Sequence, residues 1–209
     1  VGRRKGDRVG GLDVSPYLRV RVVVDRLVAA VVLVLCAPLI AALGWLVHRH
    51  DGGPALIAVD RVGRGGGTFK MWKLRSMRAE TSDGRATGVG LTSAGDDRIT
   101  PIGHRMRATH LDELPQLLNV ATGEMSIVGP RPTLAYQVER YDNHQRRRLA
   151  VRPGLTGLAQ VINGYDNNIE SFKRKVNLDL LYLQNCCLVN DIKIMFRTIR
   201  VVLTGSGAL

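Results

Sequence analysis

The sequence predicts an α+β protein that is mainly helical and attached to a membrane. Three observations predict this fold: an uncharged apolar run at 27–47, two short strand patterns at 55–75 joined by glycines, and helical apolar spacing near residue 200. The 209 residues are 45% hydrophobic and carry a net charge of +12. This composition excludes a wholly disordered chain, and the length suits one domain with an appended element.

The excess of positive charge favours an anionic partner, which can be nucleic acid, anionic lipid or a phosphorylated substrate. Only 5% of residues are aromatic, and no zinc-finger, RNP or bZIP pattern is present, so we expect no nucleic-acid partner. Three cysteines, two of them adjacent, indicate no disulfide framework. Neither a metal-binding histidine spacing nor a serine-hydrolase motif is found. The composition favours a membrane or a phosphate as partner.

Residues 1–20 predict a basic tail and residues 21–50 a membrane helix. The uncharged run at 27–47 has 21 residues, about the ~20 that cross a bilayer as a helix. A cleavable signal peptide would be shorter and nearer the start of the chain. Seven Lys or Arg residues lie in 1–26 and seven in 48–78, so the positive-inside rule favours neither orientation.

Pro38 lies just past the middle of this run, and we expect a kink there. Its ring removes a backbone N–H and clashes with the carbonyl of Val34. Flank charge alone leaves two topologies: an ordinary kinked transmembrane helix, or a re-entrant helix that keeps both basic flanks on the same side.

Residues 51–209 are expected to form the domain outside the membrane. Segments 55–62 and 68–75 predict a β-hairpin with a glycine turn at 63–67 that lacks the P-loop pattern. The polar, glycine-rich stretch 79–97 predicts a surface loop. Helices are expected at about 112–120, over 133–150 and near the end of the chain, where Ile192, Phe196 and Ile199 follow helical spacing. The basic polar face of that last helix suits a membrane interface.

The sharpest chemical signal is the carboxylate pair Asp112 and Glu113, followed by Pro115. Because proline is poorly tolerated beyond the first helical turn, we expect a helix to begin at or near Asp112. Free N–H groups and the helix dipole would then favour an ionised carboxylate and could also hold phosphate oxygens. Ordinary capping of a helix by acidic residues is the alternative.

Basic residues near turns accompany the carboxylates. Arg131 is fixed between Pro130 and Pro132, and its planar guanidinium matches phosphate oxygens in pairs. Taken singly, each basic residue would be a solvated surface charge; together they indicate an anionic phosphate substrate. The candidate phosphate ligands are Lys73, Arg75, Arg107, Arg131 and Arg152.

Several further motifs follow one another along the chain: 61–64 with Phe69, 73–77, 97–100 with 102–103, 111–116 with 119–120, 125–132, 152–157 and Asp191. With these motifs in this order, the chain from about Arg21 to Leu203 resembles the bacterial sugar transferases, which are monotopic polyprenyl-phosphate phosphoglycosyl transferases. The resemblance is to the small, minimal form of the family, because the several N-terminal transmembrane helices of larger members are missing.

The resemblance implies that a UDP-sugar donates its sugar 1-phosphate to polyprenyl phosphate, usually undecaprenyl phosphate, and that UMP is released. This is the first membrane step of exopolysaccharide, O-antigen, capsule or glycoprotein assembly. Asp112 would be the nucleophile and Glu113 a ligand of Mg²⁺, with Lys73, Arg107 and Arg131 lining the site. The family's helix is re-entrant and broken near a Ser-Pro, so the resemblance favours that topology, with the active site on the cytoplasmic face of the bacterial inner membrane beside anionic lipid.

Two positions depart from the family pattern. Ala37 replaces the serine before Pro38, and His110 stands where serine or threonine is commoner. Glucose, galactose and N-acetylated sugars all fit the sequence, which predicts no particular oligomeric state. The alternative function is a basic, membrane-anchored protein that binds nucleic acid or anionic lipid without catalysis. It accounts for the charge and the apolar run, but not for Asp112, Glu113 and the proline-flanked Arg131.

Overall fold

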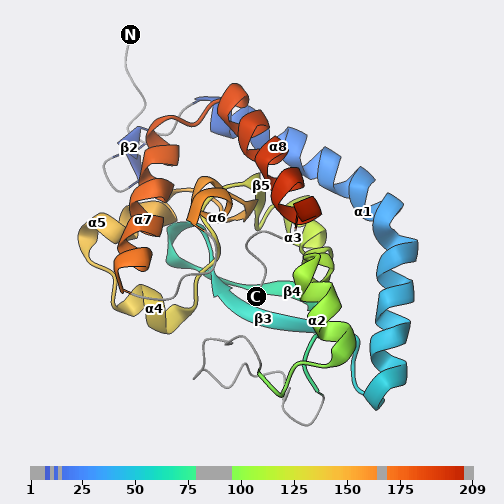
Figure 1. The fold of residues 1–209 in the computed structure, drawn as a ribbon. Helices are drawn as coiled ribbons and strands as arrows, with labels where there is room; N and C mark the ends of the chain where they lie inside the picture. Colours follow the sequence, from blue (N-terminus) through green and yellow to red (C-terminus); the bar gives the residue numbers. More distant parts are fainter. Residues whose placement is uncertain (1–7, 10–11, 14–15, 79–95, 164–168, 205–209) are drawn as a thin grey trace.

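The computed structural model describes residues 8–9, 12–13, 16–78, 96–163 and 169–204, and the fold is mainly helical with short strands (Figure 1). The loop expected at 79–97 lies almost wholly outside these residues, as does much of the tail expected at 1–20. The elements are β1 (Arg8–Val9), β2 (Leu12–Asp13), α1 (Pro16–Asp51), β3 (Leu56–Val62), η1 (Arg64–Gly66), β4 (Thr68–Leu74), α2 (Pro101–Ala108), η3 (Leu111–Glu113), α3 (Gln116–Thr122), β5 (Ser126–Val128), α4 (Ala135–Glu139), α5 (Asn143–Arg146), η4 (Arg147–Ala150), β6 (Gly154–Thr156), α6 (Leu158–Asn163), α7 (Ile169–Gln184) and α8 (Leu188–Thr204).

The helix α1 is long and apolar enough to span or anchor in a membrane, and it is the one such helix among the described residues. It begins at Pro16, inside the segment expected as a tail, and continues through Pro38 for 36 residues. At ~1.5 Å per residue this exceeds the ~30 Å of a bilayer core. Figure 1 shows that α1 bends along its length. Only 11% of its most apolar window is buried, whereas the core helix of a soluble protein is mostly buried.

The hairpin expected at 55–75 is confirmed as the antiparallel pair β3 and β4, in register from Leu56 opposite Leu74 to Val62 opposite Thr68. Both of its faces are covered. Met71 packs with residues of α3 in one cluster, and Leu74 packs with Val47 of α1 in another. The hairpin therefore packs on α3 through one face and on the C-terminal part of α1 and on α2 through the other.

Two of the expected helices differ in the structure. The helix expected to begin at Asp112 begins at Gln116, and Asp112 lies in the preceding 3₁₀ turn, η3, because Pro115 occupies the N-cap of α3. The single helix expected over 133–150 is three short pieces, α4, α5 and η4. The chain breaks because Asp142 starts a new helix: its Oδ1 accepts a hydrogen bond of 2.7 Å from the N–H of Gln145. The helix expected near the end of the chain is confirmed as α8.

A parallel pair, β5 and β6, was not expected from the sequence. Ser126 pairs with Gly154 and Val128 with Thr156. The backbones approach so closely that a Cβ atom on Gly154 would lie 2.1 Å from the nitrogen of Gly129. Only glycine fits at this position. The pair fixes the loop that begins at Gly129 and carries Arg131.

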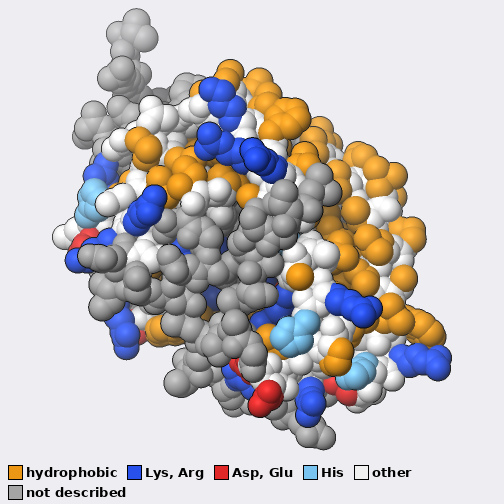
Figure 2. All heavy atoms as spheres, viewed as in Figure 1, with side chains coloured by type: hydrophobic (Ala, Val, Ile, Leu, Met, Phe, Trp, Pro, Cys, Tyr) orange, Lys and Arg blue, Asp and Glu red, His pale blue; other side chains and the backbone are white. Residues whose placement is uncertain are grey.

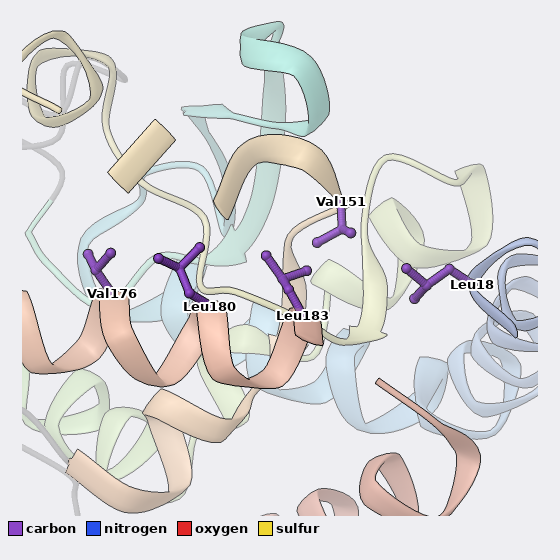
Figure 3. Close-up of a cluster of buried hydrophobic side chains, with 5 residues drawn as sticks. All are labelled: Leu18, Val151, Val176, Leu180 and Leu183. Atoms are coloured by element: carbon purple, nitrogen blue, oxygen red, sulfur yellow. The ribbon is translucent and has the colours of Figure 1, made fainter. Parts of the chain in front are cut away.

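The helix α7 contributes to two further clusters: Phe172 packs with Val62 of β3 in one, and three of its leucine and valine residues lie in the other. Figure 3 shows Val176, Leu180 and Leu183 projecting from the same side of α7, with Val151 and Leu18 beyond the Leu183 end of the row, and all five are buried. Because Leu18 belongs to α1, this cluster joins the membrane helix to the C-terminal part of the domain.

Candidate functional site

The turn η3 places the two carboxylates of the site. It follows His110, whose φ of 56° and ψ of 17° lie in the left-handed region, so the chain reverses sharply after α2. The turn closes through a hydrogen bond of 3.1 Å from the N–H of Glu113 to the carbonyl of His110. Asp112 and Glu113 are only 6% and 9% exposed. Two adjacent carboxylates are thus buried at the start of α3.

Two cations converge on Glu113. Its Oε1 accepts hydrogen bonds of 2.9 Å from Nζ of Lys73 and of 2.9 Å from Nη2 of Arg131. The same Nζ of Lys73 lies 3.8 Å from Oδ2 of Asp112. The strand β4, the turn η3 and the loop after β5 meet at this point, so the structure brings together four of the residues that the sequence singled out.

The two neighbouring carboxylates have pKa shifts of opposite sign. Burial raises the pKa of Asp112, and the attraction of Lys73 and Arg107 offsets this only in part. Burial would also raise the pKa of Glu113, but Arg131 and Lys73 together outweigh it and hold that pKa well below its usual value. Glu113 is a fixed anion, whereas Asp112 carries a charge that its surroundings stabilise poorly.

Arg131 is held by its backbone. The carbonyl of Pro130 accepts a hydrogen bond of 2.8 Å from the N–H of Gly154, and the carbonyl of Arg131 accepts one of 3.1 Å from Nη2 of Arg148. Arg148 is itself buried and pairs at 2.6 Å with Asp179. The side chain of Arg131 nevertheless remains 41% exposed, so it can reach both Glu113 and a ligand.

The other predicted phosphate ligands differ in their positions. Arg107 lies near Asp112, and its Nε donates a hydrogen bond of 2.8 Å to Oγ of Ser76. Arg75 is 1% exposed and pairs instead with Asp51 at the end of α1. Arg152 donates a 2.7 Å hydrogen bond from Nε to the carbonyl of Gly123. Neither Arg75 nor Arg152 has a described bond to the carboxylates.

Asn119 was not selected as a site residue from the sequence, although it supports the site. It is completely buried; its Oδ1 accepts a hydrogen bond of 3.0 Å from the N–H of Trp72, and its Nδ2 donates one of 2.7 Å to the carbonyl of Lys70. These bonds attach α3 to β4, the strand that carries Lys73. The signal in the sequence was a polar residue on the apolar face of a helix.

The two carboxylates suit a divalent cation whose remaining ligands come from a substrate. Among the residues that the structure describes, no group of three or more His, Cys, Asp or Glu could enclose a metal ion. Mg²⁺ is held by one or two carboxylates together with substrate phosphates and water, which matches Asp112 and Glu113. Both described bonds of Glu113 go to Oε1.

Comparison with known proteins identifies the chain. A galactosyl transferase, CpsE of Streptococcus agalactiae, is 39% identical over 89% of this chain and 41% of its own length. A UDP-N-acetylgalactosamine-undecaprenyl-phosphate N-acetylgalactosaminephosphotransferase of Aeromonas hydrophila is 36% identical over 97% of this chain and 48% of its own. A UDP-glucose:undecaprenyl-phosphate glucose-1-phosphate transferase of Caulobacter vibrioides is 40% identical over 93% and 73%.

The chain thus spans less than half the length of the first two relatives and about three quarters of the third. The family model described as bacterial sugar transferase matches residues 17–205, which include α1, the hairpin, both carboxylates and α8. With that match over nearly its whole length, the chain belongs to the bacterial sugar transferase family.

Proposed function

We propose that the protein is a phosphoglycosyl transferase that moves a sugar 1-phosphate from a UDP-sugar to polyprenyl phosphate. The observation that carries the proposal is the buried Asp112 beside a Glu113 that is held by Lys73 and Arg131. The relatives from Aeromonas hydrophila and Caulobacter vibrioides act, by their names, on undecaprenyl phosphate. A binding protein without catalysis would leave this buried charge cluster unexplained.

The reaction runs through Asp112 in two displacements. A carboxylate oxygen of Asp112 attacks the phosphorus that bears the sugar, and the bond from that phosphorus to the bridging diphosphate oxygen breaks, so UMP leaves with the electron pair. An oxygen of polyprenyl phosphate then attacks the same phosphorus. The bond to Asp112 breaks, which yields polyprenyl diphosphate sugar and restores the free carboxylate. A covalent route lets a soluble donor and a lipid acceptor use one site in turn.

The chain's basic residues have the roles that this chemistry requires. An anionic nucleophile approaching a diphosphate meets strong repulsion, and electrostatic stabilisation carries most of the catalysis of phosphoryl transfer. Arg131 and Arg107 bind and orient phosphate oxygens, while Lys73 stabilises the charge of Asp112 from 3.8 Å. When bound, Mg²⁺ would be held by Glu113 and the substrate phosphates and would neutralise charge on the diphosphate.

Two helices, α1 and α8, support a membrane location. We propose that α1 is re-entrant in the bacterial inner membrane and that α8 lies at the cytoplasmic interface. Phe196 and Ile199 are 69% and 55% exposed on α8, the helix that also carries Lys193, Arg197 and Arg200. Apolar side chains facing acyl chains and cations facing anionic headgroups are typical of an interfacial helix. The site would then open toward a lipid acceptor.

The proposal is tested by UMP release from purified protein in detergent or nanodiscs. A panel of UDP-glucose, UDP-galactose and their N-acetylated forms is incubated with polyprenyl phosphate and Mg²⁺, and the donor that the enzyme uses defines the sugar. We expect UMP to accumulate over many turnovers only when donor, lipid and Mg²⁺ are all present; without lipid, at most one UMP is released per protein molecule. Glu113→Gln should lower the rate and raise the Mg²⁺ concentration required. No UMP from any donor would contradict the proposed function.

A further inference from the structure

Arg61, near the end of β3, is a partly buried cation, and the residues that the structure describes provide it with no bonded partner. Its Nε atom is buried with no hydrogen-bond partner, and within the part of the chain that the structure describes its side chain forms no ion pair. By contrast, the nearby Lys73 and Arg131 both bond to Glu113. Such an isolated guanidinium is uncommon, because buried charges are normally paired.

The fold brings Arg61 to the site. Directly opposed residues of a hairpin lie on the same face, and so do residues four apart along one strand. Arg61 is opposite Phe69, and Phe69 is four residues before Lys73 on β4. Arg61 and Lys73 therefore lie on the same face of the hairpin. The next residue, Val62, donates a backbone hydrogen bond of 2.9 Å to the carbonyl of Thr133. That bond attaches the end of β3 to the loop 130–133, which carries Arg131. Arg61 and Lys73 therefore flank the region where Arg131 meets Glu113.

The charges around Arg61 do not neutralise it. Burial and then the positive charge of Arg131 lower the pKa of Arg61, Glu113 and Tyr136 oppose them, and the net result is a pKa of about 10. The charge of Glu113 is already shared between Lys73 and Arg131. The free protein thus holds two neighbouring guanidiniums and one shared carboxylate, an arrangement that an added anion would stabilise.

We propose that Arg61 is a substrate-binding residue that, together with Arg131, holds a phosphate group of the substrate. The inference rests on the proposed function and extends it by naming a ligand to the phosphate. We assign the donor's diphosphate to Arg61, because a diphosphate offers enough oxygens for two guanidiniums at once. The phosphate of the lipid acceptor has the same chemistry, and the experiment distinguishes the two sources.

The test compares Arg61→Met with Lys70→Met in the full chain. Lys70 lies on the same hairpin, and its only described ion pair, with Asp60 at 3.8 Å, joins side chains that are 69% and 75% exposed. The dissociation constants of UDP, inorganic diphosphate and uridine are measured by calorimetry, together with the thermal unfolding midpoint. We expect Arg61→Met to weaken UDP and diphosphate about ten- to hundredfold, the range of a lost charged hydrogen bond.

Two readouts separate this role from a structural one. Uridine, which has no phosphate, should bind equally to both variants and to the wild type. The unfolding midpoint of Arg61→Met should be unchanged or higher, because the substitution removes an unpaired buried charge from the free protein. Arg61→Lys keeps the positive charge but lacks the planar guanidinium that binds two phosphate oxygens at once, so it should fold and show an intermediate loss of UDP affinity. This second variant keeps the test valid if Arg61→Met unfolds.

Two kinetic measurements assign the phosphate to its source. The first is formation of the sugar-phosphate adduct on Asp112 from UDP-sugar without lipid, and the second is transfer from the preformed adduct to polyprenyl phosphate. Slower adduct formation with normal transfer in Arg61→Met supports the donor assignment. Normal adduct formation with slower transfer overturns it. UDP affinity within about twofold of wild type in both Arg61 variants overturns the inference itself. A wild-type protein that binds neither UDP nor diphosphate overturns the proposed function as well, so the two failures are distinguishable.

Discussion

At the scale of single residues, the site depends on the different surroundings of two neighbouring carboxylates. Glu113 receives two cations at 2.9 Å on one oxygen, whereas the closest described cation to Asp112 is Lys73 at 3.8 Å. Glu113 is consequently a stable anion that positions cations and could bind a metal. Asp112 is the less stabilised anion, as a nucleophile should be.

The different surroundings of Glu113 and Asp112 predict different effects when each carboxylate is replaced by its amide. Glu113→Gln removes the anion shared by Lys73 and Arg131, and since both cations are partly exposed we expect a loss of about 1–3 kcal/mol. Asp112→Asn removes a charge whose pKa is raised by burial, so the free energy of unfolding should stay equal or increase. Thermal unfolding at pH 7 in one detergent measures both. An equal loss in Asp112→Asn would contradict this difference.

Part of the geometry of the candidate site could be predicted from the sequence. The sequence identified Asp112, Glu113, Lys73 and Arg131, which do meet, because local chain signals such as Pro-Arg-Pro limit where those residues can lie. Arg75 was named with Lys73 as a candidate phosphate ligand, but β4 ends at Leu74, and Arg75 turns to Asp51. Asp51 is distant in the sequence, so no local pattern could identify that ion pair. The isolation of Arg61 is likewise a property of the folded chain alone.

At the scale of elements, a buried polar network attaches α1 to the rest of the protein. Nη1 of Arg21 donates to Oδ2 of Asp191 at 2.8 Å, and its Nη2 donates to the carbonyl of Val128 at 2.9 Å. Tyr17 and Tyr182 also donate to Asp191, at 2.7 and 2.8 Å. Together these bonds join α1, β5, α7 and α8, so the membrane helix has a fixed direction relative to the site.

Arg21→Met should therefore destabilise the protein strongly. It leaves Asp191 buried without its cation, and removing one partner of a buried ion pair costs about 3–5 kcal/mol. Lys70→Met is the control, since its exposed pair with Asp60 contributes less than about 1 kcal/mol. Chemical denaturation in detergent compares the two. Similar midpoints for both variants would show that the network does not hold α1.

Pro38 is expected to keep both flanks of α1 on one side of the membrane. Pro38→Ala restores the backbone hydrogen bond, and a straight helix of this length at ~1.5 Å per residue is long enough to span. A single cysteine placed near residue 1, in a background without the native cysteines, should then become labelled from outside intact cells in a fraction of molecules. Leu39→Ala serves as the control. Outside labelling with Pro38 present would exclude the re-entrant topology.

The elements that the sequence predicted well are those set by local pattern. The hairpin and α8 follow from alternation, glycine turns and helical spacing. The pair β5 and β6 joins segments that are far apart in the chain, and each strand has only three residues, too few for a periodic signal. The start of α3 was misplaced because proline is compatible both with the first turn and with the N-cap position that Pro115 occupies.

At the scale of the whole molecule, apolar side chains gather along the edge formed by α8 and α1 (Figure 2). Lysine and arginine side chains lie beside that edge, in keeping with the net charge of +12. A surface with a long apolar edge and adjacent cations suits the headgroup region of an anionic bilayer. This arrangement would place the carboxylates close to a membrane-bound acceptor while a soluble donor enters from the aqueous side.

The measurement that tests the central claim most directly is intact mass spectrometry of the protein after incubation with its UDP-sugar and Mg²⁺ but without lipid. We expect a sugar-phosphate adduct on the wild type, mapped by peptide fragmentation to Asp112 and lost when polyprenyl phosphate is added. Asp112→Asn should carry no adduct and should lose turnover by orders of magnitude while remaining folded. An adduct on another residue, or an active Asp112→Asn variant, would contradict the account.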